Sequence, residues 1–443
     1  MNNALNIAVV GSGISGLSSA WLLSRNHRVT LFEKDSRLGG HSNTVDIMTS
    51  AGTIAVDTGF IVFNKHCYPN LVALFEHLSV PYTSTTMSFG VSLDKGRLEY
   101  SGSDSISSLF AQRKNLFSLR FWRMVLDILR FYRKSEHWLE QLPNDMTLGE
   151  LLKKEGFSKG FSEDHLLPMS AAIWSTPADQ MLQYPAKTFL RFCINHGLVQ
   201  VKNRPQWQSV IGGAREYVRK ISGSLNDVKL NCGVKSVKRS ADKVFITDDN
   251  GDTHSFDHVV FASHADETLA MLEDPSKEEQ QLLGSFQYEE NRAILHRDER
   301  LMPKLGEVWS SWNYLSGSQD QQQKVSVSYW MNALQHLPCH ESIIVTLNPL
   351  REPRPHLTYQ EFNYHHPVFD RKALQAQQKL WSLQGQQRSW YCGSYFGYGF
   401  HEDGIQSGLA VAEALGGERR PWSVENESGR IILETNPGVD AAA

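Results

Sequence analysis

A short apolar run followed at once by a glycine-rich turn limits what this chain can fold into more than any other feature. Residues 7–10 read Ile-Ala-Val-Val, which is typical of a buried parallel strand, and residues 11–16 form a GxGxxG turn. Residues 17–24 then favour a helix, and residues 29–32 favour a second strand. Together these segments predict a βαβ unit at the start of the chain.

Each glycine of this turn has a physical role in binding a dinucleotide. Gly11 permits the tight turn, Gly13 leaves the backbone open to a pyrophosphate, and Gly16 lets the helix and strand pack closely. The helix N-terminus offers free N–H groups and the positive end of its dipole to the phosphates. A carboxylate at the end of the second strand accepts hydrogen bonds from a ribose. We therefore expect a dinucleotide, NAD or FAD, on Gly11, Gly13, Ile14, Ser15, Gly16 and Glu33.

The residues that follow distinguish between the two dinucleotides. Residues 33–41 read Glu-Lys-Asp-Ser-Arg-Leu-Gly-Gly-His, with a second glycine pair at Gly39 and Gly40. This arrangement resembles the flavin amine oxidase superfamily, in which an acid followed by a Gly-Gly pair wraps the nucleotide of FAD. That superfamily usually has arginine after the pair, where this chain has His41, and Arg37 lies close by. Because no second GxGxxG occurs, we expect one FAD whose electrons pass to oxygen, a quinone or an internal redox cycle.

The resemblance extends to segments far along the chain. Residues 56–64 resemble the segment beside the isoalloxazine, where Gly59 would let the backbone approach the ring. The equivalent of Val234 lies against the adenine, and a strand ending near Ala262 returns to the nucleotide. A late helix, expected from about Gly404 to Leu415, would stabilise negative charge on the reduced flavin with its N-terminus. The resemblance adds Lys34, Arg37, Gly39, Gly40, His41, Gly59, Phe60, Val234, Ala262, Gly393, Asp403, Gly404 and Ile405 to the expected cofactor site.

Within the superfamily, the chain is similar to predicted oxidoreductases that look like the N-terminal flavin domain of plant cyclopropane fatty acid synthases. The strings that carry this likeness are residues 41–45, 57–64, 68–70, 172–175, 195–198, 329–332 and 399–404. Membership of this branch implies a link to the modification of lipid acyl chains, and it does not fix the reaction. No cysteine lies in a recognisable covalent-flavin motif, so the FAD is expected to be bound non-covalently.

Candidates for catalysis come from the same strings. His196 and His401 are the acid or base candidates, since histidine titrates in the useful range. Tyr395 and Tyr398 occupy roughly the place of the aromatic cage of the superfamily. Lys324 precedes an apolar strand, but its sequence position favours a solvated strand-end lysine over a flavin-side role. No GxSxG elbow and no His, Cys, Asp and Glu spacing typical of a metal site occurs, so neither hydrolase chemistry nor a metal is predicted.

The order of these segments predicts an α/β fold with a Rossmann-type FAD-binding domain and an interwoven α+β substrate domain, as in amine oxidases and glutathione reductases. The expected stretches are 1–84, 205–285 and 388–420 for the FAD-binding domain, 85–204 and 286–387 for the substrate or cap domain, and 421–443 for a loosely ordered tail.

Charge and composition narrow the partners. The net charge of −4 argues against nucleic acid, and five scattered cysteines favour a reducing compartment. No apolar run approaches the ~20 residues of a membrane span, so a cytoplasmic protein is expected. Residues 116–142 predict a basic, aromatic amphipathic helix, which fits either peripheral contact with the inner membrane surface or a cap helix of the substrate domain. The oligomeric state is not indicated.

Three functions remain in competition at this point. The first is an FAD-dependent oxidoreductase that dehydrogenates, isomerises or oxidises an apolar substrate such as a lipid or fatty acyl chain. The second is a flavin amine oxidase that produces an imine and hydrogen peroxide. The third is a flavoprotein partner of a lipid methyltransferase. Oxidation of a polyene or tetrapyrrole rests only on the shared superfamily.

Overall fold

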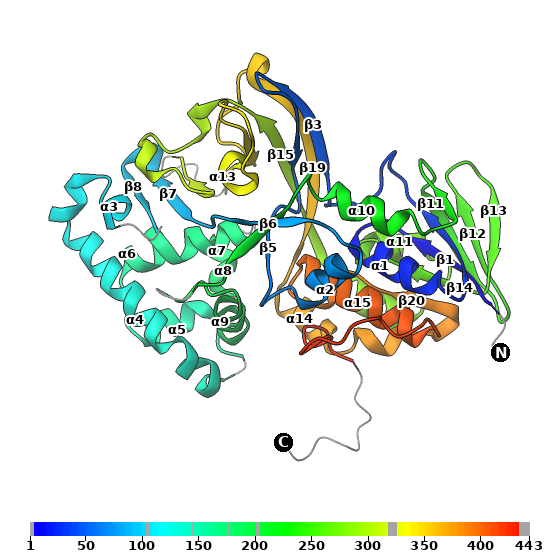
Figure 1. Ribbon diagram of the computed structural model, residues 1–443. Helices are drawn as coiled ribbons and strands as arrows, with labels where there is room; N and C mark the ends of the chain where they lie inside the picture. The colour runs from blue at the N-terminus through cyan, green and yellow to red at the C-terminus, as the bar shows by residue number, and fades with distance from the viewer. Residues whose placement is uncertain are drawn as a thin grey trace.

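The computed structural model describes residues 4–102, 106–143, 145–174, 178–200, 204–317 and 326–433. Ser175, Lys324 and residues 434–443, which entered the sequence analysis, lie outside these ranges. The mixed α/β class predicted from the sequence is confirmed: helices and strands alternate, and the strands form two large sheets. Figure 1 shows the first sheet with its helices on one side of the molecule and helices α3–α9 on the other.

The predicted βαβ unit forms the centre of a five-stranded parallel sheet. Its parts are β1 (Asn6–Val10), α1 (Ile14–Leu23) and β2 (Arg28–Phe32), and β1 pairs with β2 on one side. The strand order is β10 (Asp227–Lys229), β2, β1, β14 (His258–Phe261) and β20 (Ser389–Tyr391). Three distant stretches of chain therefore meet in one sheet, and the carboxyl ends of their strands lie at one edge.

Alternation along β1 explains why its residues 7–10 are all apolar. Ala8 and Val10 belong to one core cluster, which includes the small antiparallel sheet of β11 (Val234–Arg239), β12 (Val244–Asp248) and β13 (Thr253–Phe256). Ile7 and Val9 belong to another cluster, on the side of α1. A strand covered on both faces needs apolar residues at every position. The turn at residues 249–251 joins β12 to β13 in an antiparallel hairpin.

The second large sheet has seven strands and lies away from the glycine turn. Its order is β19 (Thr358–Val368), β15 (Gln287–His296), β18 (Ile344–Leu347), β17 (Ser326–Trp330), β16 (Trp312–Leu315), β7 (Phe89–Leu93) and β8 (Leu98–Ser101). The apolar strand expected after Lys324 corresponds to β17. The long β15 and β19 lie between the two halves of the molecule in Figure 1.

Helices and two small sheets complete the architecture. The long predicted helix is α4 (Leu119–Gln141), preceded by the 3-10 turn η2 (Arg113–Phe117). The other helices are α2 (Pro69–His77), α3 (Ile106–Leu109), α5 (Leu148–Lys154), α6 (Lys159–Phe161), α7 (Leu167–Trp174), α8 (Ala178–Leu182), α9 (Ala186–Asn195), α10 (Arg215–Ser222), α11 (Ala265–Met271), α12 (Lys277–Leu283), α13 (Met331–Gln335), α14 (Arg371–Gln377) and α15 (His401–Ala414). The small sheets are β3 (Thr44–Thr49) with β4 (Gly52–Asp57), and β5 (Phe63–Asn64) with β9 (Trp207–Val210) and β6 (Tyr82–Thr85).

Helices α1 and α15 pack unusually closely, and glycines make this contact possible. A Cβ atom at Gly404 would lie 2.8 Å from Cγ2 of Ile14, and one at Gly408 would lie 2.3 Å from the carbonyl oxygen of Ser15. Any side chain at these positions would force the helices apart. The close contact brings the N-termini of both helices to the same region of the molecule.

Both helices begin three residues earlier than the sequence indicated. The first turn of α1 starts at Ile14 because Gly13 adopts an extended conformation as its N-cap. The first turn of α15 starts at His401, so Asp403 lies within the helix and not before it. There its carboxylate accepts a 2.7 Å hydrogen bond from the backbone N–H of Phe400 and closes the first turn.

Residues 421–433 differ from the loosely ordered tail that we expected. The ring of Trp422 stacks on Trp21 with 5.8 Å between centroids, and its indole N–H donates to Asn70. The guanidinium of Arg430 lies 3.5 Å from the carboxylate of Asp403. Sequence periodicity did not reveal this segment because its order comes from single contacts with distant residues and not from a helix or strand.

The domain boundaries given above stay a prediction, although the two large sheets draw on separate stretches of chain. One segment crosses the expected division: α14 packs against α12 on the nucleotide side, well before residue 388. Among the described residues, none of the helices combines the length and the apolar character needed to cross a membrane.

We predict that Gly408→Ala destabilises the protein by about 1–3 kcal/mol, because the added methyl group overlaps the backbone of α1. Thermal or urea unfolding measures the effect. Gly306→Ala is the control, since a Cβ there meets nothing within 4 Å. Equal stability of the two variants would show that the α1–α15 contact is looser than described.

Candidate functional site

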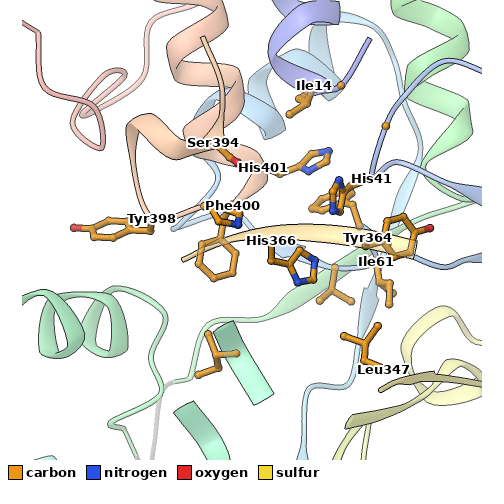
Figure 2. A pocket seen from close by; sticks show the side chains of 18 of the residues that line it. Ile14, His41, Ile61, Leu347, Tyr364, His366, Ser394, Tyr398, Phe400 and His401 are labelled. Carbon is orange, nitrogen blue, oxygen red and sulfur yellow. The ribbon is translucent and has the colours of Figure 1, made fainter. Parts of the chain in front are cut away.

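A single cavity of about 1520 Å³ begins at the glycine turn and extends to α4 and α7 on the far side of the molecule. Figure 2 shows its middle, where Ile14, His41, Tyr364 and His401 surround the open space. Of the cofactor residues predicted from the sequence, the cavity is lined by Gly11, Gly13, Ile14, Ser15, Glu33, Lys34, Arg37, Gly39, Gly40, His41, Gly59, Phe60, Val234, Ala262 and Gly393. Four others do not line it: Gly16, Asp403, Gly404 and Ile405.

The four residues outside the lining serve packing. A Cβ at Gly16 would lie 1.9 Å from the carbonyl oxygen of Gly11, so this glycine lets the helix start fold back on the turn. Gly404 lies against α1, and both Ile405 and Asp403 are fully buried. Their proposed part in cofactor binding would therefore be indirect, through the position of the two helix ends.

The glycine turn has the geometry of a phosphate cradle. Gly11 has a φ of +97°, which favours glycine, and its N–H donates to the carbonyl of Phe32 at 2.9 Å. A Cβ at Gly13 would meet nothing within 4 Å, although the residue lines the cavity. Open space therefore lies directly in front of the first turn of α1, where an anionic group is stabilised by N–H donors and the helix dipole.

Glu33 has two contacts with the turn that the motif alone did not predict. Its carboxylate accepts a 3.0 Å hydrogen bond from the N–H of Ser12, a short one from the hydroxyl of Ser12, and a 2.9 Å one from the N–H of Asp35. The side chain is 7% exposed and lines the cavity. Glu33 thus holds the glycine turn in shape and presents a carboxylate edge to the space where a ribose would lie.

Two nitrogens beside the glycine turn are buried without a hydrogen-bond partner among the described residues. They are Nη1 of Arg37 and Nε2 of His41, and both residues line the cavity. Burial is the main reason that the pKa of His41 lies well below its usual value, and the neighbouring His366, His264, His401 and Arg37 lower it further. His41 is therefore neutral, and Arg37 is the nearby residue that brings a positive charge to this part of the cavity.

Asp57 fixes the segment that passes the middle of the cavity. Its buried carboxylate accepts hydrogen bonds from the hydroxyl of Thr44 at 2.6 Å, the N–H of Ala214 at 2.9 Å and the side-chain amide of Gln335 at 2.8 Å. Burial raises the pKa of Asp57 to about 7 despite these donors. The three partners come from β3, α10 and α13, so one side chain connects both halves of the fold at the cavity.

Gly59 and Phe60 follow directly and face the cavity. A Cβ at Gly59 would lie 2.2 Å from the carbonyl oxygen of His41, and the N–H of Phe60 donates to the same oxygen at 2.8 Å. The ring of Phe60 stacks on His401 with 3.7 Å between centroids. These contacts join the Gly-Gly segment, the 57–60 segment and the start of α15 at one point.

His401 is held rigidly at that point. Its Nε2 lies 2.6 Å from the hydroxyl of Tyr217 and 3.1 Å from that of Ser42. Burial lowers the pKa of His401 to about 3, so the ring is neutral. Nδ1 is the ring nitrogen that these bonds do not use. His401 lines the cavity, and its contacts favour a positioning role over proton transfer through Nε2.

His196 has a different arrangement. Its Nδ1 lies 2.9 Å from the carbonyl oxygen of Phe192, which assigns the proton to Nδ1 and leaves Nε2 as an acceptor. Nε2 is buried without a hydrogen-bond partner among the described residues, and the ring stacks on Phe192 with 3.9 Å between centroids. Burial, followed by the charge of Arg430, lowers the pKa of His196 to about 3. The cavity thus has a neutral imidazole acceptor on its wall.

The two tyrosines expected to form an aromatic cage both line the cavity. Tyr395 is 2% exposed, packs against Phe286 with 5.2 Å between centroids, and has a buried hydroxyl without a partner among the described residues. Figure 2 shows Tyr398 apart from His41 and His366. Burial raises the pKa of both tyrosines.

Sequence reasoning missed Tyr364 and His366, which lie on β19 beside His41. Their ring centroids are 4.9 and 5.4 Å from that of His41. The hydroxyl of Tyr364 accepts a 2.9 Å hydrogen bond from the side-chain amide of Asn43. Nδ1 of His366 lies 3.2 Å from Nδ2 of Asn291. Burial lowers the pKa of His366 to about 4. The string Tyr364-His-His366 in a strand, with alternate residues on one face, was the signal that could have revealed them.

Beyond these residues the cavity becomes apolar. The lining residues of this second part, which we call the apolar arm, include Phe89, Leu109, Val125, Ile128, Leu129, Met169, Ile173, Leu198, Trp312, Tyr329 and Leu347. The charged lining residues are Glu33, Lys34, Asp35, Arg37, Asp249, Glu267 and Arg204. All but Arg204 lie around the nucleotide end. Within the described residues, the arm thus presents no carboxylate.

These features define a Rossmann-type dinucleotide-binding oxidoreductase. At one edge of its parallel sheet lie the glycine turn, the carboxylate of Glu33 and the unpartnered nitrogen of Arg37. The family model for flavin containing amine oxidoreductases matches residues 14–348, and the chain belongs to this family. The protein is therefore an FAD-dependent oxidoreductase. The space at Gly13 and the unpartnered nitrogen of Arg37 fit the phosphates of FAD.

Comparisons with individual proteins show the same fold with divergent sequences. The CLA-producing fatty acid isomerase from P. acnes has a TM-score of 0.65 at 13% identity, covering 94% of this chain and 99% of that one. Putrescine oxidase has a TM-score of 0.64 at 15% identity, covering 93% and 99%. Carotenoid phi-ring synthase from Streptomyces griseus is 38% identical over 82 residues, which is 18% of this chain and only 16% of that protein.

We predict that Gly13→Val yields a folded protein that lacks flavin. The backbone at Gly13 accepts a side chain and no protein atom lies in the way, but the valine occupies the space in front of α1. The ratio of absorbance of the flavin band to that of the protein measures loading, and circular dichroism measures folding. A yellow variant with normal loading would contradict this position for the phosphates.

The buried histidines also predict acid sensitivity. The pKa of His196 falls from 6.5 to about 3 on folding, so only the unfolded chain gains a proton as the pH drops below 6.5. Stability is therefore fully present above pH 6.5 and is lost as the pH falls toward 3. We expect His196→Gln to reduce the slope of unfolding free energy against pH near pH 5 by about 1.4 kcal/mol per pH unit. An unchanged slope in urea titrations would show that His196 is protonated in the folded state.

Proposed function

We propose that FAD bound along the nucleotide end of the cavity acts on a lipid or fatty acyl chain that lies in the apolar arm. Arg37 and the first turn of α1 would hold the pyrophosphate, Glu33 the ribose, and the 57–60 segment with the start of α15 would border the ring. The observation that carries the proposal is the continuity of one cavity from Gly13 to Ile128 and Met169, with an apolar lining over its second part.

The charge of the arm supports an apolar substrate over an amine. An ammonium group that leaves water for an apolar cavity needs a carboxylate or several acceptors to offset its lost hydration. The arm offers no carboxylate among its described lining residues, and its one charged residue, Arg204, is a cation. Long acyl chains, in contrast, gain about 0.8 kcal/mol for each methylene that leaves water.

Dehydrogenation, isomerisation and oxidation of the chain all remain within the proposal. Bound FAD supplies hydride acceptance and return. Nε2 of His196 is the acceptor best placed to receive a proton or a substrate hydroxyl, while His401 positions Phe60 and the start of α15. Net dehydrogenation requires an external electron acceptor such as oxygen or a quinone, whereas isomerisation does not. The names of two similar proteins, a fatty acid isomerase and a carotenoid synthase, agree with an apolar substrate.

A flavin amine oxidase is the second candidate, and the family and the likeness to putrescine oxidase favour it. An amine would have to enter the arm in its neutral form, because the described lining residues of the arm include no carboxylate. A third candidate is a flavoprotein partner of a lipid methyltransferase, which would bind FAD and catalyse no reaction with it.

We further propose that the protein lies in the cytoplasm, peripherally at the inner membrane surface, where an acyl substrate is found.

Anaerobic mixing of the yellow holoprotein with a panel of long-chain fatty acids, phospholipids, polyamines and aromatic amines tests the proposal. We expect acyl compounds to bleach or perturb the flavin band and amines to leave it unchanged. Reduction by amines alone would establish the second candidate. No response to any compound, together with flavin-free variants that keep the biological effect, would establish the third.

A matched pair of variants links the response to the apolar arm. We predict that Ile128→Asp weakens the lipid response at least about tenfold, because the buried carboxylate must be desolvated beside the chain. Leu230→Asp is the control, since this leucine is 40% exposed and does not line the cavity. Equal responses of both variants would place the acyl chain outside the arm.

A further inference from the structure

The surface formed by η2 and the first half of α4 exposes more large apolar side chains than a solvated surface normally does. We call this surface the docking face, and its members are Leu116, Phe117, Leu119, Trp122, Leu126 and Leu129. Phe117 is 89% exposed and Leu119 is 88% exposed. Clustered exposed apolar residues of this kind mark an interaction site.

The docking face is one stripe of an amphipathic helix whose other stripe is buried. Positions 119, 122, 126 and 129 follow the helical period and lie on one side of α4. Phe121, Met124 and Phe131 face the opposite way and are almost fully buried in the core. Because the core-facing stripe is already satisfied, the fold of this chain does not account for the exposed stripe.

Positive charge surrounds the docking face. Residues 113–134 contain seven lysines and arginines and one acidic residue, in a chain whose net charge is −4. That acid, Asp127, is buried and lies 3.0 Å from Arg130. Within the described residues, Arg113, Arg123 and Arg133 are exposed and form no recorded ion pair. Arg120, Arg130 and Lys134 pair with Asp164, Asp127 and Glu155. Exposed arginines outside these pairs, beside apolar side chains, are the pattern that matches an anionic bilayer.

The docking face adjoins the apolar arm of the cavity. Leu109, Val125, Ile128 and Tyr132 line the arm beside it, and Leu129 belongs to both sets, since it lines the cavity and is 48% exposed. Helix α4 therefore lies between bulk solvent and the arm. At Leu129 its surface is apolar both where it meets solvent and where it meets the arm.

We propose that the docking face binds the surface of an anionic phospholipid bilayer and that acyl substrates enter the arm past Leu129 without crossing water. The α4 helix lies in the interface with Phe117, Leu119, Trp122 and Leu126 among the acyl chains, and Arg113, Arg123 and Arg133 reach the phosphates. Bilayer binding stands on the surface alone, whereas entry of substrate rests on the proposed function.

Flotation of the holoprotein with vesicles tests the docking face. We expect binding to vesicles of phosphatidylcholine with phosphatidylglycerol, weak binding to pure phosphatidylcholine, and loss of binding at high salt. The double variant F117S/L119S should bind the anionic vesicles at least about tenfold more weakly, and R113Q/R123Q should lose the preference for anionic lipid. M48S is the matched control, because Met48 is 70% exposed on β3 and lies outside this surface.

Two outcomes would overturn the proposal. The first is absence of wild-type binding to anionic vesicles at low salt, or equal binding of F117S/L119S and M48S. The second is a stable dimer in size-exclusion chromatography that F117S/L119S dissociates, which would assign the surface to a second copy of the chain. Flavin absorbance and melting temperature confirm that every variant is folded and loaded.

Uptake of the fluorescent fatty acid cis-parinaric acid separates docking from the proposed function. We expect F117S/L119S to slow transfer of this probe from anionic vesicles and to leave its affinity from dilute monomeric solution unchanged. If the protein binds vesicles but takes up the probe neither from vesicles nor from monomeric solution, the proposed acyl substrate is wrong and the docking face still stands. Equal rates of probe transfer from vesicles to wild type and to F117S/L119S would contradict substrate entry from the bilayer.

Discussion

The contact between α1 and α15 is the constraint on which the rest of the structure depends. Gly404 and Gly408 lie so close to Ile14 and Ser15 that no side chain fits between the helices. This approach brings the start of α1, which borders open space at Gly13, and the start of α15, which carries His401, to one cavity. Two segments nearly four hundred residues apart thus form a single site. At the start of α15, the carboxylate of Glu402 accepts a hydrogen bond from the side-chain amide of Asn70 on α2.

Burial of neutral groups gives the site its chemical character. His41, His196, His366 and His401 all line the cavity, and burial lowers the pKa of each below its usual range. The middle of the cavity is therefore polar but uncharged, and the arm beyond it is apolar. Such a gradient suits a flavin ring with a hydrocarbon against it, because neither a cation nor an anion on the substrate would be stabilised there. The basic apolar surface that we propose as the docking face adjoins the far end of the same cavity.

The sequence predicted the parts whose signal is local, and it missed those formed by distant contacts. The glycine spacing at Gly11–Gly16 predicted the first βαβ unit, because Gly11 has a positive φ and Gly16 packs directly on the backbone of Gly11. The start of each helix was off by one turn, since Gly13 and Phe400 act as caps without a typical capping side chain. Tyr364 and His366 escaped notice because only the pairing of β19 with β15 brings them beside His41. The buried contacts of Arg430 escaped for the same reason, since no periodicity surrounds it.

Acid precipitation of the purified protein, with identification of the released chromophore by mass spectrometry, tests the central claim most directly. The account predicts one FAD per chain in the supernatant and a colourless pellet, because the cradle of Gly13, Glu33 and Arg37 holds a dinucleotide through non-covalent contacts and none of the cysteines lies in a covalent-flavin motif. Release of NAD or FMN in place of FAD, or colour that stays in the pellet, would contradict it.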